Sequence, residues 1–319
     1  MSLPTSVMPR SLLLVALLLS SQAGIAADGH RLKQRADAVL SLMSYTVVPD
    51  VTASDLNIGS GTNDKNALSI TQFGGGATLS ESFPLYLEGT MGYSRYDPQF
   101  VFSDGAEKRN IPTKWNSLTA TGGIGWDFHL YKDRWGGNLV FRPIFNVMLG
   151  TMVSDLRVGT WAIQQKRDAD MQFLDGGRLN AYGLGGSLML DYELFSESQD
   201  IDVELRYSGM NLETFGDTAE AVQGQASAEN LGLYVRRRAP ISDWTLLQSP
   251  VRYVLEGAHT EYLGDQRGKL GFDNLSSVGV GLELDSSKYN VFVTRTRLVA
   301  RYMFGNNTSG YGIGFAMSF

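Results

Sequence analysis

The sequence predicts an all-β fold: a 12-stranded antiparallel transmembrane β-barrel with a short N-terminal helix in or under the lumen. Three observations predict it. Apolar residues alternate with small or polar ones along many segments, as in barrel strands. The last such segment runs to the terminal Phe319. No stretch after the N-terminus holds the ~20 consecutive apolar residues that a membrane helix needs.

Composition narrows the class of protein. The chain has 319 residues with 43% hydrophobic and 19% charged residues, which is typical of a folded protein. Mean hydropathy is -0.12, too low for a helical membrane protein of this size. A net charge of -6 argues against a nucleic-acid partner. The chain has no cysteine, which excludes disulfides and thiolate metal sites. We expect no cofactor and no bound metal.

The N-terminal 27 residues have the features of a cleaved signal peptide. Arg10 precedes a Leu-rich run at 11–21, and Gly24 and Ala26 satisfy the small-x-small cleavage rule. Export of this kind predicts a Gram-negative-type cell envelope and, for a barrel, the outer membrane.

Residues 28–43 are predicted to form an amphipathic helix, because apolar residues such as Leu32, Ala36 and Val39 recur at helical spacing. Periodicity does not locate a helix, so a position inside the lumen and a position under the barrel both stay open. Residues 44–319 are then the barrel.

The barrel region divides into alternating segments. In the terminal strand Tyr311, Ile313, Phe315, Met317 and Phe319 alternate with glycine, alanine and serine, and we expect this strand to direct membrane insertion. A periplasmic β-sandwich is the alternative, but it would usually place polar residues on the second face. The predicted strands are 44–58, 67–79, 84–96, 116–130, 138–152, 181–195, 201–213, 229–239, 251–263, 275–285, 291–304 and 309–319.

Connection lengths support this division. The connections 80–83, 131–137, 196–200, 240–250 and 286–290 alternate with a mostly longer set, as short periplasmic turns alternate with outer loops. Pro49 and Pro143 interrupt two strands, and proline is tolerated in a sheet only at an edge or a bulge.

Four segments carry a resemblance to a known family: 43–49 (MSYTVVP), 70–79 (ITQFGGGATL), 87–98 (LEGTMGYSRYDP) and 310–319 (GYGIGFAMSF). With the helix and twelve strands, they resemble the translocator domain of autotransporters, over roughly residues 30–319. Fewer than twenty residues separate Asp28 from the first predicted strand, so the nearest resemblance is to solitary barrels without a passenger. The resemblance implies a monomer in outer-membrane lipid, inserted by the barrel-assembly machinery that recognises the C-terminal strand.

The lumen-facing positions carry many charges, which must be paired or hydrated. The residues concerned are Arg142, Glu204, Arg206, Glu283, Arg295, Arg297 and Arg301. One interpretation is a structural or transport-related barrel whose side chains close the lumen. The alternative is a small anion-leaning, porin-like channel, with Arg295, Arg297 and Arg301 attracting anions.

An outer-membrane hydrolase is a third class of function. It requires a histidine beside a nucleophile or an acid. His129 has Asp127 on its own face near the periplasmic end, and His259 has Glu261, on a face that the register directs outward. Neither histidine lies in a nucleophile motif such as Gly-x-Ser-x-Gly. We therefore predict no catalytic residue and no enzyme activity.

Overall fold

The structure is a computed structural model that describes residues 51–59, 65–97, 99–103, 108–112, 115–154, 178–218, 223–268, 271–285 and 294–318. The predicted signal peptide (1–27), the predicted helix (28–43) and positions 44–50 of the first predicted strand lie outside these ranges. Among the described residues, no helix is long and apolar enough to cross a membrane.

Each of the twelve predicted strands has a counterpart among the described residues. Three further short strands accompany them: a hairpin at the loop end and one strand that continues another. The strands are β1 (Val51–Gly59), β2 (Lys65–Thr78), β3 (Leu85–Asp97), β4 (Gln99–Ser103), β5 (Lys108–Pro112), β6 (Trp115–Trp126), β7 (Phe128–Lys132), β8 (Asn138–Ser154), β9 (Arg178–Phe195), β10 (Asp200–Thr214), β11 (Gln225–Leu246), β12 (Ser249–Gly264), β13 (Asn274–Asp285), β14 (Arg295–Gly305) and β15 (Thr308–Ser318).

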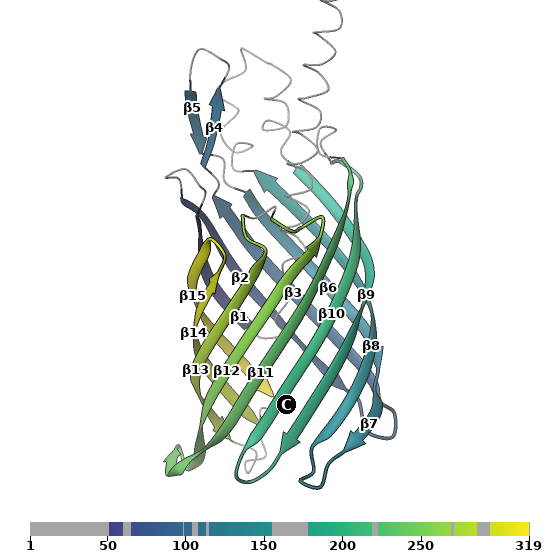
Figure 1. Ribbon diagram of the computed structural model, residues 1–319, viewed down its shortest axis with the longest axis vertical. Helices are drawn as coiled ribbons and strands as arrows, with labels where there is room; N and C mark the ends of the chain where they lie inside the picture. The colour runs from purple at the N-terminus through teal and green to yellow at the C-terminus, as the bar shows by residue number, and fades with distance from the viewer. Residues whose placement is uncertain are drawn as a thin grey trace, which may run out of the picture.

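The antiparallel ladder closes on itself. The strands follow the order β6-β3-β2-β1-β15-β14-β13-β12-β11-β10-β9-β8-β7, and β6 also pairs with β8. First and last strands meet with Val51 opposite Phe315. Because β7 continues β6 along the same edge of β8, the wall has twelve strand positions (Figure 1). Of the additional strands, β4 and β5 form a separate hairpin at the end with the longer connections (Figure 1). The predicted all-β barrel of twelve strands is confirmed.

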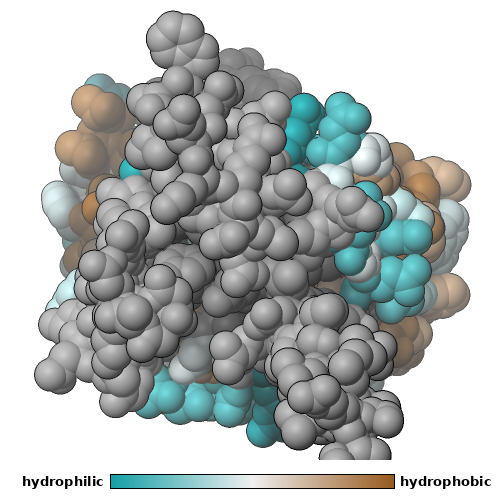
Figure 2. Space-filling view, turned by 90° about the horizontal axis from the view of Figure 1, so that it is seen from above, coloured by the Kyte–Doolittle hydropathy of each residue, from teal (hydrophilic) through white to brown (hydrophobic). Residues whose placement is uncertain are grey.

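The outer surface of the wall is apolar. Along β15, Tyr311 and Ile313 are 73% and 61% exposed, although both are large and apolar. Similar side chains face outward on β3, β6, β8, β9, β12 and β14. Seen from the loop end, hydrophobic residues stand at the outer edge and hydrophilic residues gather towards the viewer (Figure 2). A continuous exposed apolar belt of this size fits lipid and would be costly in water.

The side chains that fill the lumen differ between its two ends: they are apolar near the loop end and charged near the short turns. Near the loop end, inward side chains form a buried apolar cluster that includes Leu68, Trp115, Met152, Leu179 and Leu212. The charged residues lie on the same strands or their neighbours, closer to the short turns. Sequence alternation predicted small or polar residues inside, so the apolar cluster is a finding of the structure.

Two prolines, Pro143 and Pro240, coincide with irregularities in the strand pairing of the wall. Pro143 pairs with Leu188 of β9, whereas on its other side the ladder breaks at Asp127, between β6 and β7. A missing N–H explains this break, since proline cannot donate to a neighbouring strand. At Pro240 the predicted strand end is wrong. The register shifts between Pro240 and Thr245, and β11 continues to Leu246.

Candidate functional site

The inward charges form the most distinctive site of the barrel. Strand alternation places every second residue of each strand inside. All seven predicted lumen residues lie on inward positions of β8, β10, β13 and β14. Arg142, Glu283, Arg297 and Arg301 are buried, with exposed fractions of 7%, 1%, 6% and 7%. Arg206 and Arg295 are partly exposed, with side-chain fractions of 24% and 25%.

One ion pair crosses the lumen. Arg206 on β10 donates through Nη1 and Nη2 to the Glu88 carboxylate on β3, at 2.9 and 2.6 Å. Three strands, β6, β8 and β9, separate these two strands in the wall. Asn146 on β8 also donates to Glu88, at 2.6 Å, and Ser187 on β9 accepts from Arg206 at 2.9 Å. The contact therefore links side chains of four strands, β3, β8, β9 and β10.

A second group gathers at the short-turn end around Asp200. This carboxylate, 1% exposed, accepts from Arg252 and Arg295 at 2.9 Å each and contacts Arg238 at 3.4 Å. Arg238 also donates to Glu283 at 3.0 Å. One carboxylate thus contacts arginines from three strands, β11, β12 and β14.

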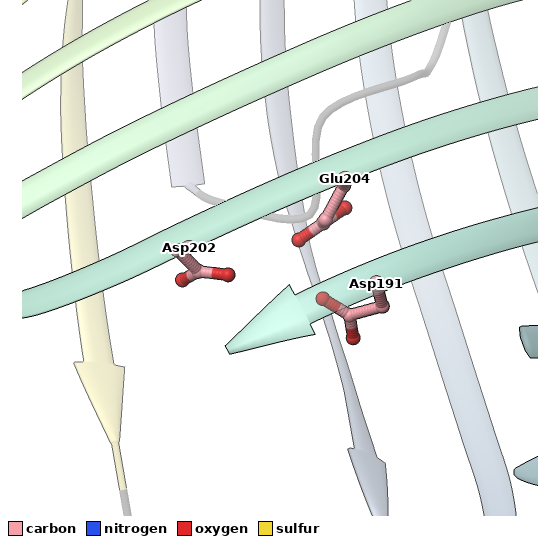
Figure 3. A group of neighbouring side chains, drawn as sticks. All are labelled: Asp191, Asp202 and Glu204. Atoms are coloured by element: carbon pink, nitrogen blue, oxygen red, sulfur yellow. The ribbon is translucent and has the colours of Figure 1, made fainter. Parts of the chain in front are cut away.

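A third group is acidic. Carboxylate oxygens of Asp191, Asp202 and Glu204 lie within 4.8 Å of one another, from the neighbouring strands β9 and β10 (Figure 3). Arg142 donates to Asp191 at 2.9 Å and also binds Asp127, while Arg236 binds Asp202. Carboxylates at this spacing are able to hold a cation. Two of the three have arginine partners, so we assign them to the ion-pair network.

The predicted row of arginines on β14 is present, and each member has an acidic partner. Arg295 contacts Asp200, Arg297 contacts Glu283 at 3.7 Å, and Arg301 binds Glu256. Tyr234 donates a further hydrogen bond to Glu256 at 2.9 Å. Each arginine of the row is therefore in contact with a carboxylate, although Asp200 and Glu283 are shared with arginines of β11 and β12.

Asp200 is the site residue that the sequence analysis missed. It was assigned to the connection 196–200, whereas it is the first residue of β10. The alternation of Asp202 and Glu204 extends back to Asp200, so the inward position could have been inferred. The contacts of Asp200 with three arginines could not have been inferred from the sequence, because the arginines belong to three other strands.

The two histidines in the barrel lie outside this network. His129 is exposed on β7 and hydrogen-bonds Asn138. His259 lies on the outward face of β12, 46% exposed, beside Glu261. The terminal strand keeps Tyr311, Ile313 and Met317 outward, while Phe315 is half-buried and Phe319 lies outside the described residues.

A closed antiparallel ladder, an apolar belt outside and paired charges inside define the class: this is an integral β-barrel of the outer-membrane type. No family model matches the chain, and no curated protein sequence matches it. Solved structures do match. The chain is similar to autotransporter translocator barrels.

Three of these structures illustrate the similarity. The translocator domain of NalP from Neisseria meningitidis is 14% identical, covering 94% of this chain and 97% of that one, with a TM-score of 0.41. The transport unit of AIDA-I from Escherichia coli is 11% identical over 90% and 99%, with a TM-score of 0.48. The β domain of Bordetella BrkA is 14% identical over 84% and 96%, with a TM-score of 0.43. These low values transfer no activity, so the class rests on the geometry of this chain.

Proposed function

We propose that this protein is a translocator-type outer-membrane barrel whose lumen is held closed to ions by its own side-chain pairs. The pair of Arg206 and Glu88 carries the proposal, because it joins β3 to β10 through the lumen although three strands separate them in the wall. The apolar cluster near the loop end adds a second, uncharged obstruction. A barrel of twelve strands is also narrower than the open porins of 16–18 strands.

The charge pairing argues against an anion channel. An anion-selective pore needs positive charge that remains available to the passing ion. Arg295, Arg297 and Arg301 each contact a carboxylate, from Asp200, Glu283 and Glu256 respectively. We therefore propose a structural role for this row, and no catalytic role for the lumen.

The route to the membrane belongs to the same proposal. Residues 1–27 are removed as a signal peptide, 28–43 form a helix in or under the lumen, and the barrel-assembly machinery recognises the C-terminal strand. Support comes from the outward Tyr311, Ile313 and Met317 of β15, which present a regular apolar row. We propose that the inserted barrel is a monomer.

Planar-bilayer conductance tests the closed lumen. We expect the refolded chain 28–319 to insert and to give no resolved current steps, and the same result for a version without 28–43. Insertion is verified by the migration shift of the folded barrel between unheated and heated gel samples. Anion-selective steps in the intact chain would overturn the proposal in favour of the channel. Steps only in the shortened chain would show that residues 28–43, rather than the ion pairs, close the lumen.

A further inference from the structure

Three polar side chains meet on the outward face of the barrel, away from the lumen network. Ser276 Oγ on β13 lies 2.8 Å from His259 Nδ1 on β12. The other ring nitrogen, Nε2, lies 3.2 Å from a Glu261 carboxylate oxygen. His259 and Ser276 are directly opposite in the ladder, and Glu261 follows two residues on along the same face. A hydroxyl, an imidazole and a carboxylate thus form one connected chain.

The proton positions follow from the carboxylate. An ionised Glu261 only accepts hydrogen bonds, so the ring proton lies on Nε2, which donates to Glu261. The Nδ1 lone pair then faces the hydroxyl of Ser276, which donates to it. This is the order of groups that activates a serine: a nucleophile, a base in contact with it, and a third group that orients the base.

The surroundings suit an amphiphilic substrate. In the ladder Leu233 stands opposite His259 on β11, and Phe304 stands opposite Ser276 on β14. Both are outward and 43% and 41% exposed, as part of the lipid-facing belt. Glu261 lies three residues before the end of β12 at the loop side. At ~3.4 Å per residue Glu261 is about 10 Å along the strand from this end, and we place the boundary between acyl chains and polar headgroups at this level.

We propose that Ser276, His259 and Glu261 form a second functional site, which hydrolyses carboxylic esters of lipids in the outer leaflet. The acyl chain lies along Leu233 and Phe304, and the headgroup extends towards the loops. Ser276 and His259 are the catalytic residues, and Glu261 is the positioning residue. The site is independent of the closed lumen, so a failure of either proposal leaves the other standing.

The chemistry balances with water as the only co-reactant. Ser276 Oγ bonds to the ester carbonyl carbon while its proton passes to His259 Nδ1. The carbon–oxygen bond to the alcohol then breaks, and the same proton leaves with the alcohol. Water attacks the acyl-serine, gives a proton to Nδ1 and releases the acid, and Ser276 recovers its proton. Asn274 lies two residues before Ser276 on the same face of β13, and we assign its side-chain amide as the donor to the developing oxyanion.

A serine-reactive fluorophosphonate probe tests the nucleophile directly. We expect the refolded chain 28–319 in detergent micelles to be labelled, with mass spectrometry locating the label on Ser276. Ser276→Ala abolishes labelling, and His259→Ala and His259→Gln slow it by about 100-fold, the scale of a lost general base. Ser277→Ala is the matched control, because Ser277 is adjacent and faces inward. Folding of each variant is checked by heat-dependent gel migration.

Hydrolysis separates the substrate classes. Phosphatidylcholine in mixed micelles should release fatty acid, at a higher kcat/KM than a water-soluble butyrate ester. Glu261→Gln should lower kcat by about 10-fold or more with KM unchanged, and Glu261→Asp should restore part of it. Absence of label on Ser276 in folded protein, or fatty-acid release that persists in Ser276→Ala, would overturn the site and leave the three side chains as a hydrogen-bonded surface group.

Discussion

Arg206 binds Glu88, 118 residues earlier in the chain, through two hydrogen bonds inside the barrel between strands β10 and β3. Removal of one member leaves the other charge buried without its main partner. We expect Glu88→Ala to lower the free energy of unfolding by about 3–5 kcal/mol. Unfolding in guanidinium, followed by tryptophan fluorescence, measures this change.

The double variant Glu88→Ala/Arg206→Ala is the control for that interpretation. It removes both charges, so it should lose less stability than the sum of the two single variants. Strictly additive losses would mean that the pair does not act as a unit.

Asp200 should be the most sensitive carboxylate at the short-turn end. Asp200→Ala leaves Arg238, Arg252 and Arg295 facing one another, and we expect a loss of about 3–5 kcal/mol. Glu197→Ala, in the same turn but exposed, should change stability by less than about 0.5 kcal/mol. The same unfolding assay compares them, and equal effects would contradict the assigned role of Asp200.

The turn after β7 predicts a pH dependence. The Tyr192 hydroxyl donates to Asp133 at 2.6 Å, and the amides of Trp135 and Gly137 donate at 2.8 Å each. These donors favour the ionised form and hold the pKa of Asp133 below its ordinary value of 3.8. Because the pKa of Asp133 is lower in the folded state, its ionised form stabilises the fold at any pH above the ordinary pKa. This stabilisation is lost as the pH falls through the folded-state pKa.

Comparison with Asp133→Asn isolates this contribution. At neutral pH the wild-type protein should unfold at a higher guanidinium concentration than the variant. This difference in unfolding midpoint should decrease as the pH is lowered. A difference that stays constant down to pH 3 would show that the carboxylate charge is not its source.

Glycines of the barrel wall should tolerate a methyl group unequally, as the lumen-facing Gly281 and the outward-facing Gly257 illustrate. A Cβ at Gly281 would lie 2.2 Å from the carbonyl oxygen of Leu298, whereas one at Gly257 would have 3.8 Å to its nearest neighbour. We expect Gly281→Ala to cost about 1–3 kcal/mol because backbone must move, and Gly257→Ala to cost much less. Thermal unfolding of the two variants checks the contrast, and equal costs would contradict it.

The fold was predictable because alternation is local. The residues next to Tyr311 or Asp202 in the sequence indicate whether its side chain faces the lipid or the lumen. This local pattern was sufficient to predict the twelve strands. The N-terminal helix stays a prediction. The end of β11 was predicted too early. Proline usually ends a strand, but here the strand continues past Pro240 after a shift in register. The turn that follows, Leu247–Gln248, has positive φ angles of 52° and 60° without the usual glycine or asparagine.

The site was only partly predictable, because contacts between strands depend on register. Sequence alternation gave the inward position of Arg206 but not its contact with Glu88 across the lumen. It gave the outward position of His259 and Glu261, and the absence of a nucleophile motif beside either histidine led to a prediction of no catalysis. Ser276 has no motif, and only the pairing of β12 with β13 brings it to the imidazole.

The uneven height of the wall has a consequence for the surrounding bilayer. Among the described residues, strands β9 and β11 have 18 and 22 residues, whereas β14 and β15 have 11 each. A bilayer adjusts its thickness to the apolar height of the protein beside it. We expect lipids to be compressed along β14 and β15 and more extended along β9 to β11. Short-chain lipids should therefore collect preferentially on one flank of this barrel.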